Sequence, residues 1–129
     1  MKKLLLILVL CLSTIGLAGC GSSAPTKVDL TFSDTNAQKS LEVGKDIKAG
    51  QYSIKYNGNK KANYYIGSSK EESTQRLLTL VKNNSGNDVF TYCERLGTKL
   101  ENDQTNTLEL KDNDVLFITS YEGEITLSK

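Results

Sequence analysis

Residues 52–58 read Tyr52-Ser53-Ile54-Lys55-Tyr56-Asn57-Gly58 and carry the strongest indication of the fold. Apolar and polar side chains alternate over the first five positions, and a period of two gives a β-strand one buried face and one solvated face. Asn-Gly follows at once, and both residue types tolerate the positive φ of a two-residue hairpin turn. The segment therefore predicts a strand and a hairpin whose second strand covers residues 62–66.

The same alternation recurs along the chain, beginning with Val28, Leu30 and Phe32. Further strands are expected at residues 77–81, 89–93, 107–110, 115–119 and 125–127. Segments rich in Asn, Asp and Gly separate several of them, and short strands with polar turns are typical of all-β domains. We predict an all-β fold, either a small antiparallel β-sandwich or a partly open barrel.

One segment, residues 68–82, is compatible with two structures. Ser69-Lys70-Glu71-Glu72 matches a capping box, which favours a helical turn. Thr79 and Val81 are β-branched and favour extended chain. We expect a strand from Leu77 onward, with the helical turn as the alternative.

The N-terminus has the pattern of a secretory signal: Met1-Lys2-Lys3, an apolar run over residues 4–12, and small residues before Cys20. The alternative is an uncleaved transmembrane anchor. However, the apolar region 4–19 has only sixteen residues and includes Ser13 and Thr14. A membrane-spanning helix needs about 20 apolar residues. We expect residues 1–19 to be a cleaved signal peptide.

The residues before the expected cleavage site, Leu17-Ala18-Gly19-Cys20, resemble the lipobox of bacterial lipoproteins at all four positions. The resemblance implies that the Cys20 thiol carries a diacylglyceryl group and that a peptidase cuts after Gly19. Two acyl chains hold a protein stably on a bilayer. The expected location is therefore the extracytoplasmic face of the cell membrane, with the lipid bilayer as a partner through Cys20. The Lys- and Asn-rich composition hints at a Gram-positive source.

The rest of the chain divides into a short linker and one domain. Residues 20–26 comprise the lipidated cysteine and a small, polar linker, and residues 27–129 form the expected extracellular β domain. Five linker residues reach at most about 18 Å. The domain is therefore expected to lie close to the bilayer.

A second resemblance lies at residues 43–52, Val43-Gly44-Lys45-Asp46-Ile47-Lys48-Ala49-Gly50-Gln51-Tyr52. This segment is similar to the V-G-x-D-I-x-A-G-x-Y segment of small extracellular β domains in Gram-positive surface lipoproteins. Residues 108–115 resemble the segment that closes such domains, with Asn113 in place of a glycine. The resemblance implies an all-β fold and no activity.

The residues of these segments have a structural interpretation of their own. Gly44 and Gly50 suit backbone positions with positive φ or close approach, and Ile47 between them is expected in the core. Asn113 is the commonest type of non-glycine residue at positive φ. The alternative is a ligand-binding loop that uses Lys45 and Asp46.

Composition narrows the possible chemistry. The chain has no histidine, which excludes Ser-His-Asp and Cys-His catalysis and most catalytic zinc sites. No glycine spacing fits a phosphate-binding loop. With Cys11 in the signal peptide and Cys20 lipidated, Cys93 is a lone thiol, expected as a small core hydrophobe. Asp112 and Asp114 suit a hairpin turn better than a calcium loop. We expect no enzyme activity, no metal and no cofactor.

Net charge and aromatic content bear on partners. Loss of Lys2 and Lys3 changes the formal charge from +1 to −1, so nucleic acid is not an expected partner. Adjacent Tyr64 and Tyr65 must point to opposite faces of a strand. One of them is therefore expected to be exposed, where it can anchor a ligand. The alternative is a ring that covers the edge of the core.

These observations favour a non-enzymatic, membrane-anchored binding module at the cell surface, whose ligand the sequence does not identify. Two alternatives remain open: an immunity-type lipoprotein that intercepts a membrane-active peptide, and an accessory subunit of a membrane complex. A small hydrolase that uses a pair of carboxylates is less favoured.

The lipobox generates a direct test. Cys20→Ala removes the only sulfur that the resemblance places at the acylation site, so metabolic labelling with a fatty acid should show no incorporation into this variant. Cys93→Ala is the matched control and should be labelled like the wild type. Persistent label in Cys20→Ala would refute the anchor.

Overall fold

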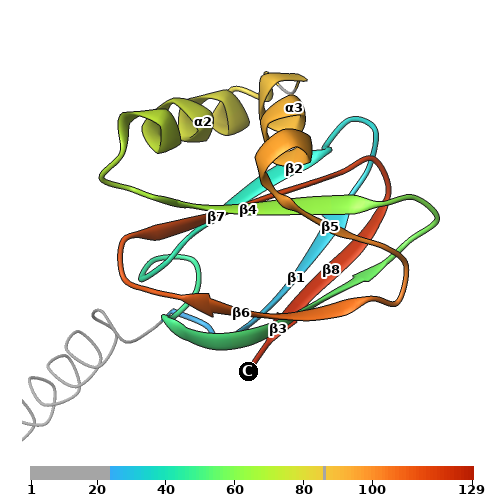
Figure 1. Cartoon of the computed structure of the whole chain (residues 1–129), viewed down its shortest axis with the longest axis horizontal. Helices are drawn as coiled ribbons and strands as arrows, with labels where there is room; N and C mark the ends of the chain where they lie inside the picture. The colour runs from blue at the N-terminus through green and yellow to red at the C-terminus, as the bar shows by residue number, and fades with distance from the viewer. Residues whose placement is uncertain (1–23, 86) are drawn as a thin grey trace, which may run out of the picture.

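The computed structural model describes residues 24–85 and 87–129, so Leu17, Ala18, Gly19 and Cys20 lie outside the described residues. Figure 1 shows two antiparallel four-stranded sheets packed face to face, with two helices lying on one of them. The all-β prediction is confirmed in the form of a β-sandwich, because neither sheet closes into a barrel. Neither of the two helices in the described part of the chain is long and apolar enough to cross a membrane.

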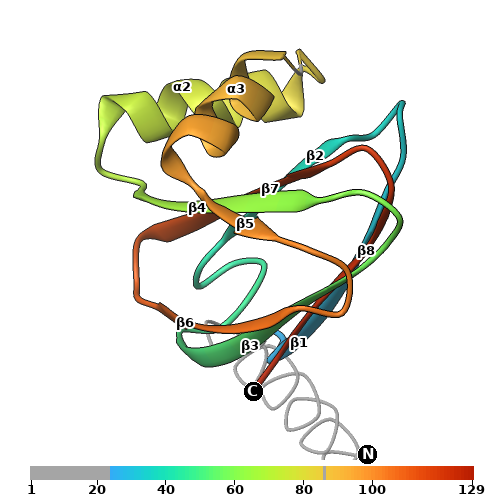
Figure 2. The same ribbon diagram turned by 45° about the vertical axis from the view of Figure 1, so that its right-hand side comes forward.

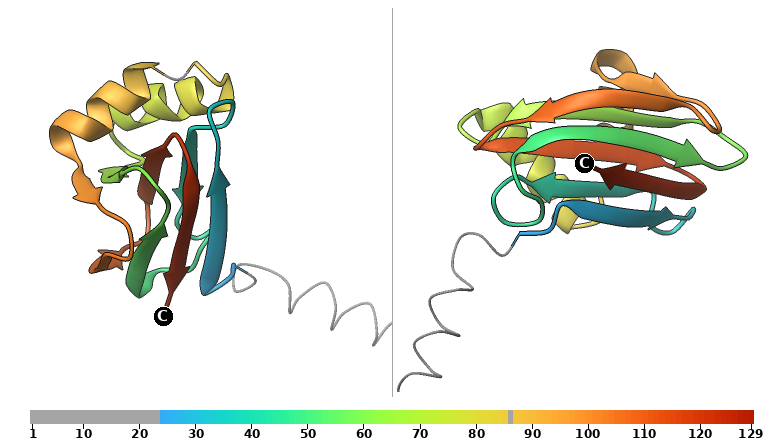
Figure 3. Two further views of the ribbon diagram at one scale, coloured as in Figure 1. Left: turned by 90° about the vertical axis from the view of Figure 1, so that its right-hand side faces the viewer. Right: turned by 90° about the horizontal axis from the view of Figure 1, so that it is seen from below.

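The sheet without helices, called the open sheet, has the spatial order β1, β8, β3 and β6. Its strands are β1 (Lys27–Phe32), β8 (Gly123–Ser128), β3 (Gly50–Asn57) and β6 (Thr105–Leu110). When the molecule is seen from below, these strands face the viewer with no helix in front of them (Figure 3, right).

The other sheet, called the covered sheet, has the order β2, β7, β4 and β5. Its strands are β2 (Gln38–Glu42), β7 (Asp114–Ser120), β4 (Ala62–Ser68) and β5 (Thr98–Leu100). Helices α2 (Glu72–Lys82) and α3 (Asn87–Leu96) connect β4 to β5 and lie on the outer face of this sheet (Figure 2).

The core between the sheets follows the expected alternation. Tyr52, Ile54 and Tyr56 of β3 are fully or almost fully buried, whereas Ser53 and Lys55 between them are exposed. Leu116 and Ile118 of β7 belong to the same cluster. The period of two therefore identified the buried face of β3 correctly.

The predicted hairpin at Asn57-Gly58 is wrong. β3 and β4 belong to different sheets, and β3 pairs with β6 and β8 instead. The Tyr56 hydroxyl donates a hydrogen bond to the Glu122 carbonyl oxygen, 2.6 Å away, and a Cβ at Gly58 would collide with that hydroxyl. Gly58 is thus required where the chain passes close to the Tyr56 hydroxyl and the Glu122 carbonyl oxygen at a corner between the sheets.

The strands predicted at residues 77–81 and 89–93 are wrong as well, because both segments are helical. Thr74, Leu77 and Leu78 are the buried residues of α2, a spacing of three and four residues. Val89 and Cys93, the buried residues of α3, are four apart. Helical periodicity therefore outweighed the local β preference of the branched residues.

The expected capping box does not form. α2 begins at Glu72, and its N-cap residue, Glu71, makes no side-chain capping hydrogen bond. Ser69 instead accepts a 2.6 Å hydrogen bond at its carbonyl oxygen from the Gln75 side chain. Packing against the sheet, not capping, accounts for the helix, as is usual for short helices.

The special backbone positions predicted from residue type in segments 43–52 and 108–115 are confirmed. Gly44, Gly50 and Asn113 have φ of 93°, 148° and 71°. Ile47 is fully buried in the core between the sheets. These residues have the structural roles expected of them.

The burial of β7 leads to a prediction about the free energy of unfolding. Phe117 is fully buried on the face of β7 that contacts the helices, so Phe117→Ala should lower the free energy of unfolding by about 3–5 kcal/mol. Urea unfolding measures this loss. Thr105→Ala, on the exposed side of β6, is the control and should change it by no more than about 0.5 kcal/mol. A loss below about 1 kcal/mol for Phe117→Ala would contradict this packing.

Candidate ligand-binding cleft

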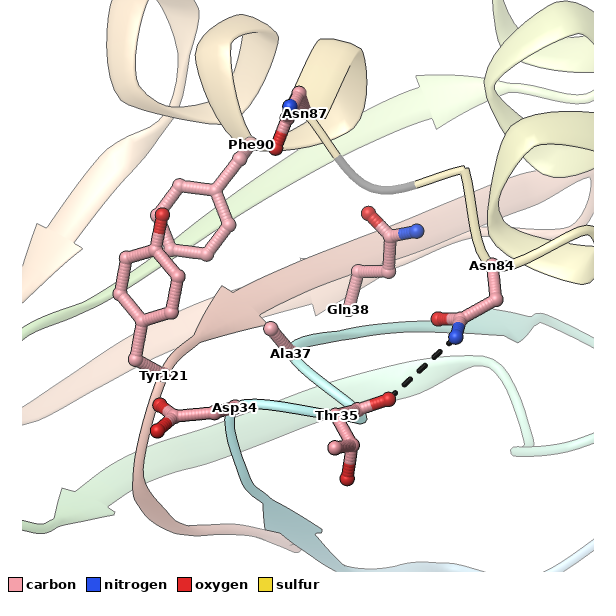
Figure 4. Close-up of a pocket in the computed structure, with 8 residues that line it drawn as sticks. All are labelled: Asp34, Thr35, Ala37, Gln38, Asn84, Asn87, Phe90 and Tyr121. Carbon is pink, nitrogen blue, oxygen red and sulfur yellow. Dashed lines mark hydrogen bonds between the residues drawn. The ribbon is translucent and has the colours of Figure 1, made fainter.

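A hollow of about 350 Å³, called the corner cleft, opens where three connections meet: the β1–β2 turn, the β7–β8 turn and the α2–α3 connection. Figure 4 shows the eight residues that line it. They are Asp34, Thr35, Ala37, Gln38, Asn84, Asn87, Phe90 and Tyr121. The cleft thus brings together segments that are far apart in the sequence.

One wall of the cleft is aromatic. The Phe90 ring on α3 stacks on the Tyr121 ring with 4.4 Å between centroids and 22° between planes. Tyr121 is nevertheless 47% exposed. The Lys60 ammonium nitrogen lies 5.6 Å from the Tyr121 centroid. This distance is within reach of a cation–π contact. The exposed part of the ring pair therefore forms an apolar surface beside the Lys60 ammonium.

The turn that carries Tyr121 is held firmly. The Glu122 carbonyl oxygen accepts hydrogen bonds from the hydroxyls of Tyr56 (2.6 Å) and Ser120 (2.8 Å). The Ser120 backbone N–H donates to the Ala37 carbonyl oxygen at 2.9 Å, which joins β7 to the end of the β1–β2 connection. Because the backbone is fixed, the aromatic wall is in place before any ligand arrives.

The opposite rim of the cleft is polar. Asp34 and Thr35 form the tip of a tight turn closed by reciprocal backbone hydrogen bonds between Ser33 and Asn36, of 3.2 and 3.0 Å. Asn84 adopts a φ of 54°, and its side-chain nitrogen lies 3.5 Å from the Thr35 carbonyl oxygen. Figure 4 shows this contact as a dashed line. This contact joins the α2–α3 connection to the β1–β2 turn.

Two further amides complete the polar surface. Gln38, the first residue of β2, is almost fully buried and directs its amide toward the space between the β1–β2 turn and the α2–α3 connection (Figure 4). Asn87 begins α3. Asn84 and Asn87 are exposed and offer both hydrogen-bond donors and acceptors.

The cleft carries little charge. Asp34 is the one carboxylate among its lining residues, and no lysine or arginine of the described chain lines it. Residues 24–85 and 87–129 also contain no group of three or more Cys, Asp or Glu side chains arranged to hold a metal ion. The arrangement suits hydrogen bonding to a ligand better than acid–base chemistry, which needs paired groups.

Tyr64 and Tyr65, the tyrosines proposed from the sequence, do point to opposite faces of β4, but neither is exposed. Tyr64 lies in the core between the sheets, and its hydroxyl accepts a hydrogen bond from Asn106 at 3.2 Å. Tyr65 lies under the helices, edge-on to Tyr92 with 5.1 Å between centroids. A hydrogen bond with Tyr92, together with burial, raises the pKa of Tyr65 to about 12. Neither tyrosine is therefore the exposed side chain that was expected, although both line a smaller hollow of about 250 Å³ together with Leu96 and Thr98.

Lys45 and Asp46, the other proposed pair, serve their own loop. The Asp46 carboxylate accepts a hydrogen bond from the Glu42 backbone N–H at 2.9 Å, and the Lys45 ammonium lies 3.7 Å from the Glu42 carboxylate. No hydrogen bond or ion pair within residues 24–85 and 87–129 joins this pair to Tyr64 or Tyr65. The four proposed residues therefore do not form one site.

Cys93 is fully buried on α3, in agreement with the expected core role. Burial raises the pKa of its thiol to about 12, and the nearby Thr119 hydroxyl, which forms no well-aligned hydrogen bond, opposes this rise only in part. Nucleophilic attack requires the thiolate. The thiol therefore stays in its neutral form at neutral pH.

The sequence interpretation missed the corner cleft because its residues are spread over three connections. One signal was available: Tyr121 is an aromatic residue directly before the turn residues Glu122-Gly123, where a core position is not expected. No such signal marks the partners of Tyr121. Phe90 stacks on Tyr121 from helix α3, whereas the sequence predicted a strand at residues 89–93.

The Cys93 pKa predicts how stability depends on pH. The unfolded thiol ionises near 9.0, whereas the folded thiol stays neutral up to about 12. The unfolded chain therefore releases this proton first, so the stabilisation is complete below pH 9.0 and is lost as the pH rises toward 12. One such group lowers the free energy of unfolding by about 1.4 kcal/mol for each pH unit in this window.

Urea unfolding at pH values of about 8 and about 10.5, on either side of the ordinary thiol pKa, measures this slope. Cys93→Ala keeps the tyrosines that titrate in the same range but lacks the thiol. It should lose less stability between the two pH values than the wild type. Equal losses would contradict the buried, neutral thiol.

No known protein family, curated protein or solved structure matches this chain.

Proposed function

We propose that this protein is a lipid-anchored, non-enzymatic binding module on the extracytoplasmic face of the cell membrane, and that the corner cleft is its binding site. The observation that carries the proposal is the convergence of an aromatic wall and a polar rim on one hollow of about 350 Å³. Small-molecule sites typically have volumes upward of about 300 Å³ and combine apolar walls with a few placed polar groups.

The position of the cleft suits an anchored protein. The Lys48 backbone N–H donates to the Pro25 carbonyl oxygen at 2.9 Å, so the chain is attached to the domain from Pro25 onward. β1 then runs for six residues and ends beside the turn of Asp34 and Thr35. A strand of this length spans about 20 Å. Figure 1 shows the start of β1 and the β1–β2 turn at opposite ends of the sandwich. This arrangement supports a cleft that faces away from the bilayer when Cys20 is anchored in it.

This orientation favours the binding module over the immunity-type alternative. A protein that intercepts a membrane-active peptide needs its contact surface at the bilayer, which is the end where β1 begins. The cleft lies at the other end, next to Tyr121 and Asp34. A partner from the surrounding envelope or medium can therefore reach it without passing the lipid.

The lining residues also support binding rather than hydrolysis. Carboxylate-based glycoside hydrolysis uses two acids about 5–10 Å apart. Asp34 is the single carboxylate among the described residues that line the cleft. A bound molecule would meet hydrogen-bonding groups and ring faces, with no second acid to complete such a reaction.

Site-specific photo-crosslinking in intact cells tests the binding site. A photoreactive residue replaces Thr35 at the cleft rim in one variant and Thr105 on the exposed side of β6 in another. Irradiation should yield a defined adduct at position 35 and none at position 105. No adduct at position 35, or equal adducts at both positions, would overturn the cleft as the binding site.

A further inference from the structure

We infer that the corner cleft binds a neutral saccharide, one or two sugar units of a glycan. The inference rests on the proposed function, in which this cleft is the binding site, and adds the chemical class of its ligand. It follows from the aromatic wall, the amide-rich rim, the lack of basic side chains among the described lining residues and the size of the hollow.

The aromatic wall matches the apolar face of a sugar ring. A pyranose presents C–H groups on its faces, and these pack on an aromatic ring with a gain from buried apolar surface. Tyr121 and Leu96 are the two large hydrophobic side chains exposed in the described chain, at 47% and 52%. Only Tyr121 lines the corner cleft, where Phe90 holds its ring in place.

The polar rim matches the hydroxyl groups around a sugar ring. A sugar hydroxyl donates one hydrogen bond and accepts others, so it is best bound by groups that do both. The exposed amides of Asn84 and Asn87 each supply donors and an acceptor. Asp34 adds a strong acceptor that can take hydrogen bonds from two neighbouring hydroxyls.

The charge of the site argues for a neutral ligand. Phosphates and carboxylates are usually bound by lysine or arginine, and neither lines the cleft in the described chain. A cationic ligand would compete with Lys60, whose ammonium already lies 5.6 Å from the Tyr121 ring. Asp34 is then the one carboxylate among the described lining residues that could pair with a cationic ligand.

The size of the hollow limits the ligand. Its volume is about 350 Å³. Small-molecule sites start at about 300 Å³, so the cleft lies near the lower end of their usual range. This room suits one or two sugar rings with the rest of a longer chain in solvent. Because the turn that holds Tyr121 is fixed by Tyr56 and Ser120, binding requires little rearrangement of the backbone.

The test uses the full lipidated chain in detergent micelles, titrated by calorimetry with defined trisaccharides. The neutral probes are triacetylchitotriose, maltotriose and cellotriose, and trigalacturonic acid is the anionic control. At least one neutral probe should bind with a Kd below about 10 mM, and the anionic probe at least about tenfold more weakly. No binding by any neutral probe, or equal binding by the anionic one, would overturn the inference.

Three variants locate the binding. Tyr121→Ala should weaken it by about tenfold, because the apolar wall is lost. Leu96→Ala, an equally exposed apolar truncation outside the cleft, should stay within about twofold of the wild type. Asp34→Asn replaces one of the two acceptor oxygens with an amide donor, so it should weaken binding by about three- to tenfold. Unchanged binding by Tyr121→Ala, or about tenfold loss in Leu96→Ala, would overturn the inference.

The crosslinking experiment separates this inference from the proposed function. Adducts at position 35 that contain sugar support both. Adducts at position 35 that contain only peptide overturn the saccharide and leave the cleft as a binding site. The absence of adducts there overturns both.

Discussion

The structure depends on the burial of β7 on both faces. Leu116 and Ile118 of this strand belong to the core between the sheets, whereas Val115 and Phe117 belong to the core under the helices. Every residue from Val115 to Ser120 is buried. A strand with two apolar faces needs cover on both, so α2 and α3 are not an addition to the sandwich. They supply the layer without which Phe117 would lie in water.

The core under the helices also contains buried polar groups that lower its stability. Asn63 and Thr74 each bury a side-chain polar atom that has no hydrogen-bond partner among the described residues. Each such group costs about 1–3 kcal/mol. Gly67 allows Thr74 to approach β4 closely, since a Cβ there would collide with the Thr74 hydroxyl. The apolar contacts of Phe117 and its neighbours must offset this cost.

The corner cleft is a consequence of the same layering. Because most successive strands lie in opposite sheets, the short connections are corners, and the β1–β2 and β7–β8 turns meet at one of them. The helices required by β7 then bring Phe90 and Asn87 to the same corner. The cleft joins the two sheets and the helical layer, and its ring pair comes from two residues that are far apart in sequence.

Local physics alone determined much of this protein. The alternation around Ile54, the positive φ of Gly44 and Asn113, and the buried Cys93 all follow from residue type and spacing. β7 also carries an available signal, since Val115-Leu116-Phe117-Ile118 is a continuous apolar run of the kind found in strands buried on both faces.

Which strands pair, and which segments become helices, was decided only by the tertiary structure. Asn57-Gly58 marks a reversal in either case, but the core between the sheets determines that β3 pairs with β6 and β8 rather than with β4. Residues 89–93 are compatible locally with a strand, and only the apolar surface of β7 selects the helix that buries Val89 and Cys93. The cleft depends on both decisions. Turn chemistry acts over a few residues, whereas burial of apolar surface depends on the whole chain.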